Sequence, residues 1–274
     1  MRQYKGMNRK IIFLDCDGTI FDVPRGMPKA SLKTKYAISE LIKNGHLVFI
    51  SSGRSRCIIP EDIVELNPTG FVTNNGGCAL NSEGIIYQEN IDDELVDLVV
   101  DYCNRHDGAY YLETQKYIKT GDLNSKLHVD FINTWGIDFS KIIDGDYKND
   151  KYQMLMTAFK DSQACFDFKK AMVNKLDTRD QYGFTSFDVS AFGIDKGYGA
   201  KKVMEYYGID SKDAYAFGDG LNDLEMLQAV KESYAVENGH PKLKALAKYI
   251  APDVLDDGFY KIMVQDGLIK PMEE

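Results

Sequence analysis

Two aspartates, Asp15 and Asp17, lie in the run Asp-Cys-Asp-Gly-Thr that follows a short apolar segment at residues 11–14. Gly18 favours a turn after them, which lets the second carboxylate swing away from the first. One carboxylate can then attack phosphorus and form an acyl phosphate, while the other serves as a general acid and later as a general base. The pair therefore predicts phosphoryl transfer through a covalent intermediate.

Two other interpretations of this run are a turn closed by an aspartate side chain and part of a calcium-binding loop. The calcium loop is excluded, because counting from Asp15 would place its obligatory glycine at Ile20 and its bidentate glutamate at Gly26. The aspartate turn stays open on the residues alone.

A second acidic run, Gly-Asp-Gly-Leu-Asn-Asp, covers residues 218–223 and follows an apolar segment at 214–217. Magnesium prefers oxygen ligands and needs only one or two protein carboxylates beside water and substrate phosphate. Asp15 and Asp219, with a loop carbonyl, would suffice as ligands. Asn222 or Asp223 could equally cap the start of a helix, and a capping residue can still contact a ligand.

Two further segments suit phosphate. Ser52 and Gly53 follow a third apolar run, and a hydroxyl beside a backbone N–H forms an anion-binding nest, although Ser-Gly pairs are often only turns. Lys196 precedes a predicted helix. Most lysines are solvated, but a cation is required here, because Asp15 must approach a phosphate of like charge. We therefore expect Lys196 to reach the same crevice.

The elements that must position these groups alternate between strand and helix. Apolar runs predict strands at residues 10–14, 46–50, 70–73, 214–217 and 233–236. Helical spacing predicts helices at residues 30–44, 197–207, 222–230 and 241–249 and at the C-terminal tail, and Gly45 suits the position just after the first helix. This alternation is typical of a Rossmann-like α/β fold with a parallel sheet, whose strand ends converge on one crevice.

The middle of the chain has a different, α+β pattern. Helical stripes at residues 91–102 and 165–176 accompany strand-like runs at 109–112, 152–159 and 184–189. We predict a core made of residues 1–80 and 190–274, split by an inserted domain at residues 81–189.

These motifs resemble those of the haloacid dehalogenase superfamily, and within it the Cof-type phosphatases of subclass IIB. The resemblance is carried by Ile-Ile-Phe-Leu-Asp-Cys-Asp-Gly-Thr (11–19), Ile-Ser-Ser-Gly-Arg (50–54), Thr-Asn-Asn-Gly (73–76), Asp-Lys-Gly (195–197), Phe-Gly-Asp-Gly-Leu-Asn-Asp (217–223), Ala-Val-Glu-Asn (235–238) and Asp-Gly (257–258). An insertion between Asn75 and Lys196 is similar to the α/β cap of C2 type that closes over the crevice in such proteins. Only residues 18–50 separate the first two motifs, too few for the earlier cap of dehalogenase and phosphomutase relatives.

The resemblance also implies roles for individual residues. Asp15 would be the nucleophile and Asp17 the acid/base, with Lys196 bridging the nucleophile and the phosphate. The implied Mg²⁺ ligands are Asp15, Asp17 through its backbone carbonyl, Asp219 and Asp223. The implied substrate-binding residues are Ser52, Gly53, Asn75, Lys196 and Asn222.

Composition narrows the function classes. With 33 basic and 42 acidic residues the formal charge is −9, which argues against nucleic acid as a partner. Five scattered cysteines indicate reduced thiols. The apolar run at residues 11–14 is too short for a signal segment or a membrane span. We expect a soluble, cytoplasmic protein, and the sequence does not indicate its oligomeric state.

The leading hypothesis is a Mg²⁺-dependent hydrolase of small phosphomonoesters, with sugar phosphates as the default substrates. The alternatives are a phosphomutase or a dedicated biosynthetic sugar-phosphate phosphatase, and a catalytically silent regulatory protein. Aromatic residues of the insertion, such as Tyr110, Tyr111 and Trp135, could stack on a substrate, although such residues more often form a core.

Overall fold

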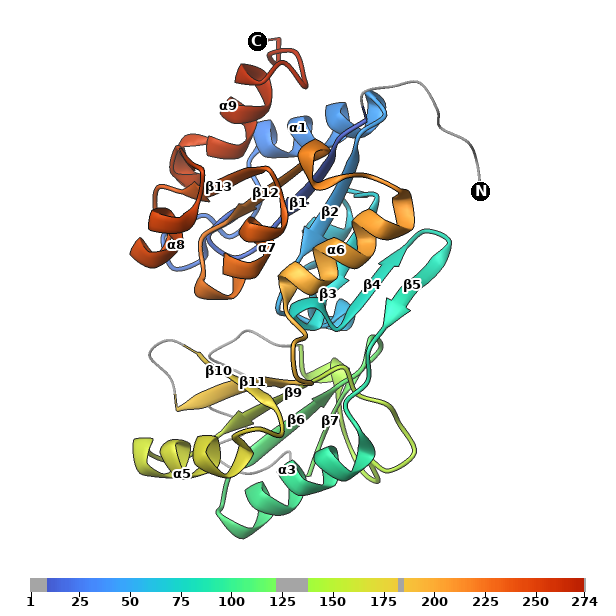
Figure 1. The fold of residues 1–274 in the computed structure, drawn as a ribbon, viewed down its shortest axis with the longest axis vertical. Coiled ribbons are helices and arrows are strands. Elements are labelled where there is room, and N and C mark those ends of the chain that lie inside the picture. Colours follow the sequence, from blue (N-terminus) through green and yellow to red (C-terminus); the bar gives the residue numbers. More distant parts are fainter. Residues whose placement is uncertain (1–8, 122–137, 182–184, 274) are drawn as a thin grey trace.

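The computed structural model describes residues 9–121, 138–181 and 185–273 and folds them into two bodies stacked along the long axis of the molecule (Figure 1). The chain crosses from the first body to the second after β5 and returns before α6. Each body is built on its own sheet. The predicted α/β fold with an inserted α+β unit is confirmed.

The first body contains an eight-stranded sheet with the order β14-β13-β12-β1-β2-β3-β4-β5. All neighbours from β14 to β3 pair in parallel, and β4 and β5 form an antiparallel hairpin at one edge. The strands are β1 (Ile11–Leu14), β2 (Leu47–Ser51), β3 (Gly70–Thr73), β4 (Cys78–Asn81), β5 (Gly84–Gln88), β12 (Ala214–Gly218), β13 (Glu232–Val236) and β14 (Tyr249–Ala251).

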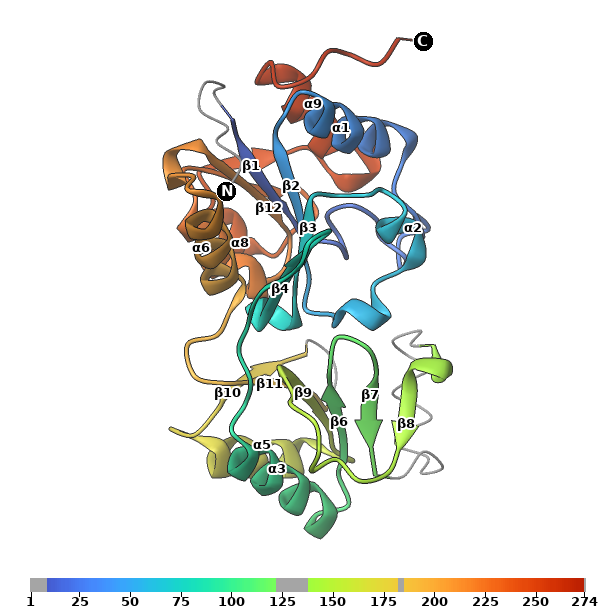
Figure 2. The ribbon, with the colours of Figure 1, turned by 90° about the vertical axis from the view of Figure 1, so that its right-hand side faces the viewer.

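Helices cover both faces of this sheet, which explains why β1 is apolar along its whole length (Figure 2). Ile12 and Leu14 pack into the cluster on one face, and Ile11 and Phe13 into the cluster on the other. The first face is covered by α1 (Leu32–Lys43), α2 (Glu61–Val64) and α9 (Gly258–Gln265). The second face is covered by α6 (Lys196–Tyr207), α7 (Leu224–Ala229) and α8 (Pro241–Leu246).

Local sequence signals set the limits of two of these helices. The Ser31 side chain caps α1 by accepting a hydrogen bond from the backbone N–H of Thr34. Gly45 follows α1 at a φ of +84°, in the left-handed conformation that the sequence predicts for it. Asp195 caps α6 in the same way, and this places Lys196 at the first position of the helix.

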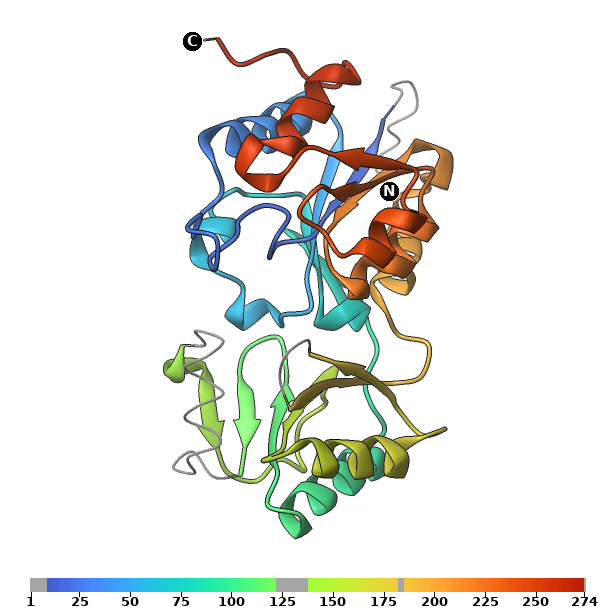
Figure 3. The same cartoon turned by 90° about the vertical axis from the view of Figure 1, so that its left-hand side faces the viewer.

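The second body contains a six-stranded sheet with the order β10-β11-β9-β6-β7-β8. Its strands are β6 (Ala109–Glu113), β7 (Ile118–Thr120), β8 (Ile142–Asp144), β9 (Met154–Ala158), β10 (Asp177–Asp180) and β11 (Ser186–Ser190). The helices α3 (Asp93–Arg105) and α5 (Ser162–Met172) lie on the face away from the first body (Figure 3). On the opposite face, a small cluster around Tyr111 and Met156 contacts Cys57 and Ile58 of the first body.

Two predicted boundaries are corrected. The predicted end of the first core segment at residue 80 falls inside the β4–β5 hairpin, so Gly84–Gln88 extend the large sheet instead of starting the insertion. The predicted helix at 241–249 ends at Leu246, and Tyr249–Ala251 form the edge strand β14. A short apolar run fits either a helix or a strand, and here pairing with β13 decides for the strand.

Candidate active site

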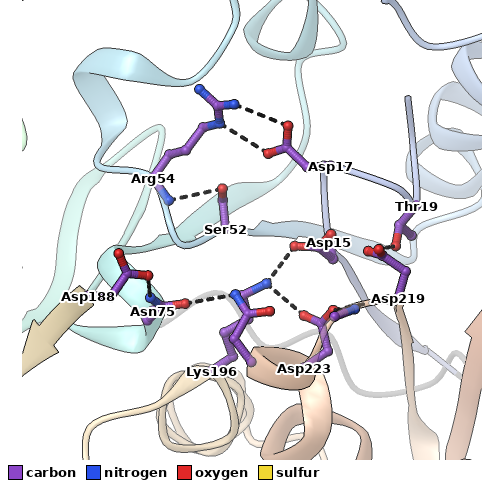
Figure 4. Close-up of polar contacts among 12 residues, drawn as sticks. Asp15, Asp17, Thr19, Ser52, Arg54, Asn75, Asp188, Lys196, Asp219 and Asp223 are labelled. Atoms are coloured by element: carbon purple, nitrogen blue, oxygen red, sulfur yellow. Dashed lines mark hydrogen bonds and ion pairs between the residues drawn. The ribbon is translucent and has the colours of Figure 1, made fainter. Parts of the chain in front are cut away.

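The loops after β1, β2 and β12 meet at the carboxyl edge of the large sheet, as the sequence predicts (Figure 4). Asp15 comes directly after β1, Ser52 directly after β2, and Asp219 directly after β12. Lys196 reaches the same edge from the start of α6. The structure therefore brings together four groups that lie up to 204 positions apart in the chain.

Lys196 is fully buried and forms two ion pairs. Its Nζ donates to Asp15 Oδ1 at 2.5 Å and to Asp223 Oδ1 at 2.6 Å. Burial alone would lower the pKa of this ammonium, but the two carboxylates raise it above its ordinary value. The lysine is therefore held as a cation against Asp15.

Asp223 supports the loop that carries Asp219. Its second oxygen, Oδ2, accepts hydrogen bonds from the backbone N–H groups of Asp219 and Gly220, both at 3.0 Å. Both oxygens of Asp223 thus have protein partners within the described structure. This arrangement fits a residue that orients the loop and Lys196, and a direct metal contact by Asp223 stays a prediction.

The donor set fits a divalent cation. Oxygens of Asp15, Asp219 and Asp223 lie within 4.8 Å of one another, and one ammonium faces these three carboxylates. Burial, and next the charge of Asp223, raise the pKa of Asp15 well above its usual range and that of Asp219 to about 7. Excess negative charge in a buried site is what a hard cation such as Mg²⁺ would neutralise.

Gly18 permits close packing between the first loop and Asp219. Its φ is +82°, and a Cβ at this position would lie 2.3 Å from Asp219 Oδ2. Thr19 Oγ1 donates to Asp219 Oδ1 at 3.2 Å. Asn238 Nδ2 donates to the Gly18 carbonyl at 2.7 Å, so the loop is held from both sides.

Asp17 turns away from this cluster, as the predicted turn at Gly18 allows. Its two carboxylate oxygens accept hydrogen bonds from Nε and an Nη of Arg54, each at 3.1 Å. Half of the Asp17 side chain is exposed, against 21% of Arg54. The predicted metal contact of Asp17 runs through its backbone carbonyl and stays a prediction. Arg54 ends the Ser-Ser-Gly-Arg run, and its pairing with Asp17 was not predicted from the sequence.

Ser52 is buried with its hydroxyl oxygen accepting from the backbone N–H of Arg54 at 3.1 Å. That bond leaves the hydroxyl hydrogen available to donate to a phosphoryl oxygen. Gly53 lies against Asn75, because a Cβ on the glycine would be 3.2 Å from Asn75 Oδ1. The predicted phosphate-binding residues on these two loops are therefore neighbours in space.

Asn75 links the two bodies. Its Oδ1 accepts from Asn222 Nδ2 at 3.1 Å, and its Nδ2 donates to Asp188 Oδ2 on β11 at 2.8 Å. Gln181 holds the other oxygen of Asp188 at 2.6 Å, and burial raises the pKa of the Asp188 carboxyl. Sequence reasoning missed Asp188. The available signal was a charged residue between the apolar Phe187 and Val189 of a strand.

Glu113 is a second buried acid of the inserted body that the sequence did not indicate. Its Oε2 accepts from Asn74 Nδ2 at 3.0 Å, while Oε1 is buried with no hydrogen-bond partner among the described residues. Burial, with a contribution from Asp188, raises its pKa to about 8. Tyr110 and Tyr111 are buried in the clusters of the inserted sheet, which favours a core role, and Trp135 lies outside the described residues.

The comparisons with known proteins agree with this geometry. The model of the haloacid dehalogenase-like hydrolases matches residues 12–263. The chain belongs to this family. It is accordingly an enzyme of the phosphatase type, as the sequence analysis expects.

Individual relatives extend over almost the whole chain. "Putative phosphatase YkrA" of Bacillus subtilis is 29% identical over 269 residues, which are 96% of this chain and all of that protein. A solved structure from Geobacillus kaustophilus HTA426 has a TM-score of 0.84 at 26% identity and covers 95% of this chain and 100% of its own. The subclass IIB sugar phosphatase BT4131 has a TM-score of 0.81 at 23% identity, covers 95% and 100%, and shares the fold.

Within the described part of this hydrolase, no helix is both long and apolar enough to cross a bilayer.

Proposed function

We propose that this hydrolase is a Mg²⁺-dependent phosphatase that cleaves small phosphomonoesters through an aspartyl-phosphate at Asp15. The observation that carries the proposal is the buried contact of Lys196 with Asp15 at 2.5 Å, beside the carboxylates of Asp219 and Asp223. A nucleophilic carboxylate that must meet a phosphate needs such a cation next to it.

The metal would be held by Asp15, Asp219 and the backbone carbonyl of Asp17, with Asp223 as the further predicted ligand. When bound, Mg²⁺ supplies positive charge to the phosphoryl oxygens and neutralises the excess charge of the carboxylates. The raised pKa values of Asp15 and Asp219 support this assignment, because burial, and next the charge of Asp223, disfavour the ionised carboxylates that a bound cation would stabilise.

Separate residues would bind the phosphoryl group, neutralise its charge and attack phosphorus. Ser52, Gly53, Asn75 and Asn222 would surround the phosphoryl group, while Lys196 neutralises its oxygens. A carboxylate oxygen of Asp15 forms a bond to phosphorus as the bond to the ester oxygen breaks.

Asp17 would move protons in both half-reactions. The ester oxygen leaves with the electron pair of the broken bond and takes a proton from Asp17. Asp17, now a carboxylate, then accepts a proton from the water that attacks the acyl phosphate, which releases inorganic phosphate and regenerates Asp15.

We propose that the inserted body acts as the cap that selects the substrate. Its sheet faces the carboxyl edge of the large sheet (Figure 2), and Asp188 on β11 accepts a hydrogen bond from Asn75, which lies in the loop after β3. Residues 89–92 and 191–195 are the segments at which we divide the core from the cap. The substrate class is small phosphorylated metabolites, with sugar phosphates first. Support comes from relatives such as the phosphoglycolate phosphatase of Methanothrix thermoacetophila, to which the chain is 25% identical over 92% of its length.

A reducing compartment such as the cytoplasm fits the thiols, because all five cysteines are free.

The test is the release of inorganic phosphate from p-nitrophenyl phosphate and a panel of sugar phosphates, with Mg²⁺ and with EDTA. Asp15→Asn is expected to abolish release while far-UV circular dichroism shows that the variant is still folded. Asp213→Asn is the matched control, because Asp213 pairs with Lys10 ahead of β12, at the other end of the strand. Turnover by Asp15→Asn would refute the assignment of Asp15 as the nucleophile. An isomerised phosphate product would indicate a mutase.

A further inference from the structure

We propose that Arg54 is a positioning residue that fixes the Asp17 carboxylate for the second half-reaction, the hydrolysis of the aspartyl-phosphate. The proposal rests on the function proposed above and extends it to a residue outside that set. The proposal is based on the bidentate contact in which Nε and an Nη of Arg54 donate to the two oxygens of Asp17.

The backbone of Arg54 is anchored within the loop that follows β2. Its N–H donates to Ser52 Oγ at 3.1 Å, and its carbonyl accepts from the N–H of Asn74 at 3.0 Å. The guanidinium therefore projects from a fixed point. A planar guanidinium that meets a carboxylate edge to edge restricts the rotation of that carboxylate more than a single hydrogen bond does.

The contact is not needed to stabilise the fold. Exposed ion pairs contribute about 0–1 kcal/mol, and half of the Asp17 side chain is exposed. Asp17 without Arg54 would be a short side chain on a loop with water on one side. The consequence of the pair is a defined direction for the carboxylate, which follows the nucleophile by two residues.

In the second half-reaction Asp17 is a carboxylate, and its contact with Arg54 leaves a lone pair free on each of its oxygens. This is the form that accepts a proton. In the second half-reaction, a water oxygen forms a bond to phosphorus as the bond from Asp15 to phosphorus breaks, and the proton of that water passes to Asp17. Positioned acid–base groups contribute about 10²- to 10⁴-fold, and loss of their alignment removes part of that factor.

The opposite interpretation is that Arg54 binds a second anionic group of the substrate and that Asp17 is only its counterion. The two interpretations differ in the step that they affect. A positioning role lowers the rate of the second half-reaction, whereas a substrate-binding role raises KM and slows the first one.

The experiment is rapid mixing of the Mg²⁺-loaded enzyme with p-nitrophenyl phosphate. Its leaving group needs no proton from the protein, so the first turnover reports phosphorylation of Asp15 alone. In Arg54→Met we expect the burst of p-nitrophenol to keep its rate within about threefold, while the steady-state rate falls about 10- to 100-fold. With dephosphorylation limiting, kcat should become the same for aryl and alkyl phosphates.

Three further variants make the result specific. Arg54→Lys keeps the positive charge but cannot donate to both oxygens of Asp17 through a planar guanidinium. It should therefore recover less than half of the rate that Arg54→Met loses. In an Asp17→Asn background, Arg54→Met should cause no additional loss, because Arg54 acts through Asp17. Arg25→Met removes a comparable Arg–Asp pair, with Asp253 at 3.0 Å, and should leave both phases unchanged.

Several outcomes would overturn the proposal. These are an unchanged steady-state rate in Arg54→Met, a burst that slows in parallel with the steady state, full recovery by Arg54→Lys, or additive losses with Asp17→Asn. The absence of any p-nitrophenol from the wild-type enzyme would instead refute the proposed function, so the two failures are distinguishable.

Discussion

Replacing Lys196 with methionine should lower both the stability and the activity of this enzyme, and a second substitution at Asp223 should restore the stability alone. Methionine is similar in length and removes only the ammonium. The change breaks two ion pairs of 2.5 and 2.6 Å at once and leaves Asp15 and Asp223 facing each other without their cation.

The size of the effect follows from burial. Removing one partner of a buried ion pair costs about 3–5 kcal/mol, because the other charge is left uncompensated. This is a large part of a typical stability of about 5–15 kcal/mol and corresponds to a fall in melting temperature of about 6–20 °C. The matched control, Lys10→Met, breaks the more exposed Lys10–Asp213 pair at 2.7 Å and should cost about 1 kcal/mol or less.

The effect of a second substitution, Asp223→Asn, on the free energy of unfolding should change sign with the residue at position 196. Asp223→Asn in the wild type removes one of the two partners of Lys196 and should destabilise. In Lys196→Met the same change removes an uncompensated charge, while the asparagine oxygen still accepts from the loop N–H groups of Asp219 and Gly220. In the Lys196→Met variant, Asp223→Asn should therefore stabilise the folded protein.

The assays are urea unfolding in EDTA, followed by far-UV circular dichroism, and hydrolysis of p-nitrophenyl phosphate with Mg²⁺. The double variant is expected to regain stability but no activity, because the loss of the cation at the phosphate costs about 10²- to 10³-fold in kcat. If Asp223→Asn destabilises equally in both backgrounds, the electrostatic reasoning is refuted.

Two more predictions concern the same cluster. Gly18→Ala should lower kcat about 100-fold with the fold intact by circular dichroism, because its Cβ would lie 2.3 Å from Asp219 Oδ2. Gly26→Ala, at a similar φ of +84° but with no atom within 4 Å of the new Cβ, should retain activity, and equal losses in both would contradict this explanation. The raised pKa of Asp219, about 7, means that the folded metal-free protein holds this proton more tightly than the unfolded chain. Its stability should therefore fall as the pH rises from about 4 to about 7 and be unaffected by this group above that range. Added Mg²⁺ should accordingly raise the melting temperature more at pH 8 than at pH 5, and Asp219→Asn should remove the difference. An equal Mg²⁺ effect at both pH values would count against the assignment.

Much of the acidic site was predictable because its signals are local. Asp15 and Asp219 each follow an apolar strand within a few residues, and parallel strands end at one edge of a sheet. That physical rule places the two loops together without any knowledge of side-chain directions. The need for a cation beside a carboxylate nucleophile likewise indicates Lys196, although no local feature of that lysine distinguishes it.

The contacts from the inserted body were not predictable. Asp188 and Glu113 carry no motif, and they lie near the loop after β3 because one sheet packs against the end of another. The β4–β5 hairpin shows the same limit at the level of the fold. Its residues have ordinary strand propensity, and pairing with β3 assigns them to the large sheet.

By itself, the sequence determined the α/β core, the order of its strands along the chain and the type of chemistry, because strand ends and residue types are local properties. The tertiary structure alone decided which partner each charge has. Asp223 neutralises Lys196 and holds the Asp219 loop, and Asp17 faces Arg54 instead of Asp15. Such pairings depend on ångström-scale distances between segments far apart in the chain. Those distances are set by packing of the whole molecule, and no spacing along the sequence encodes them.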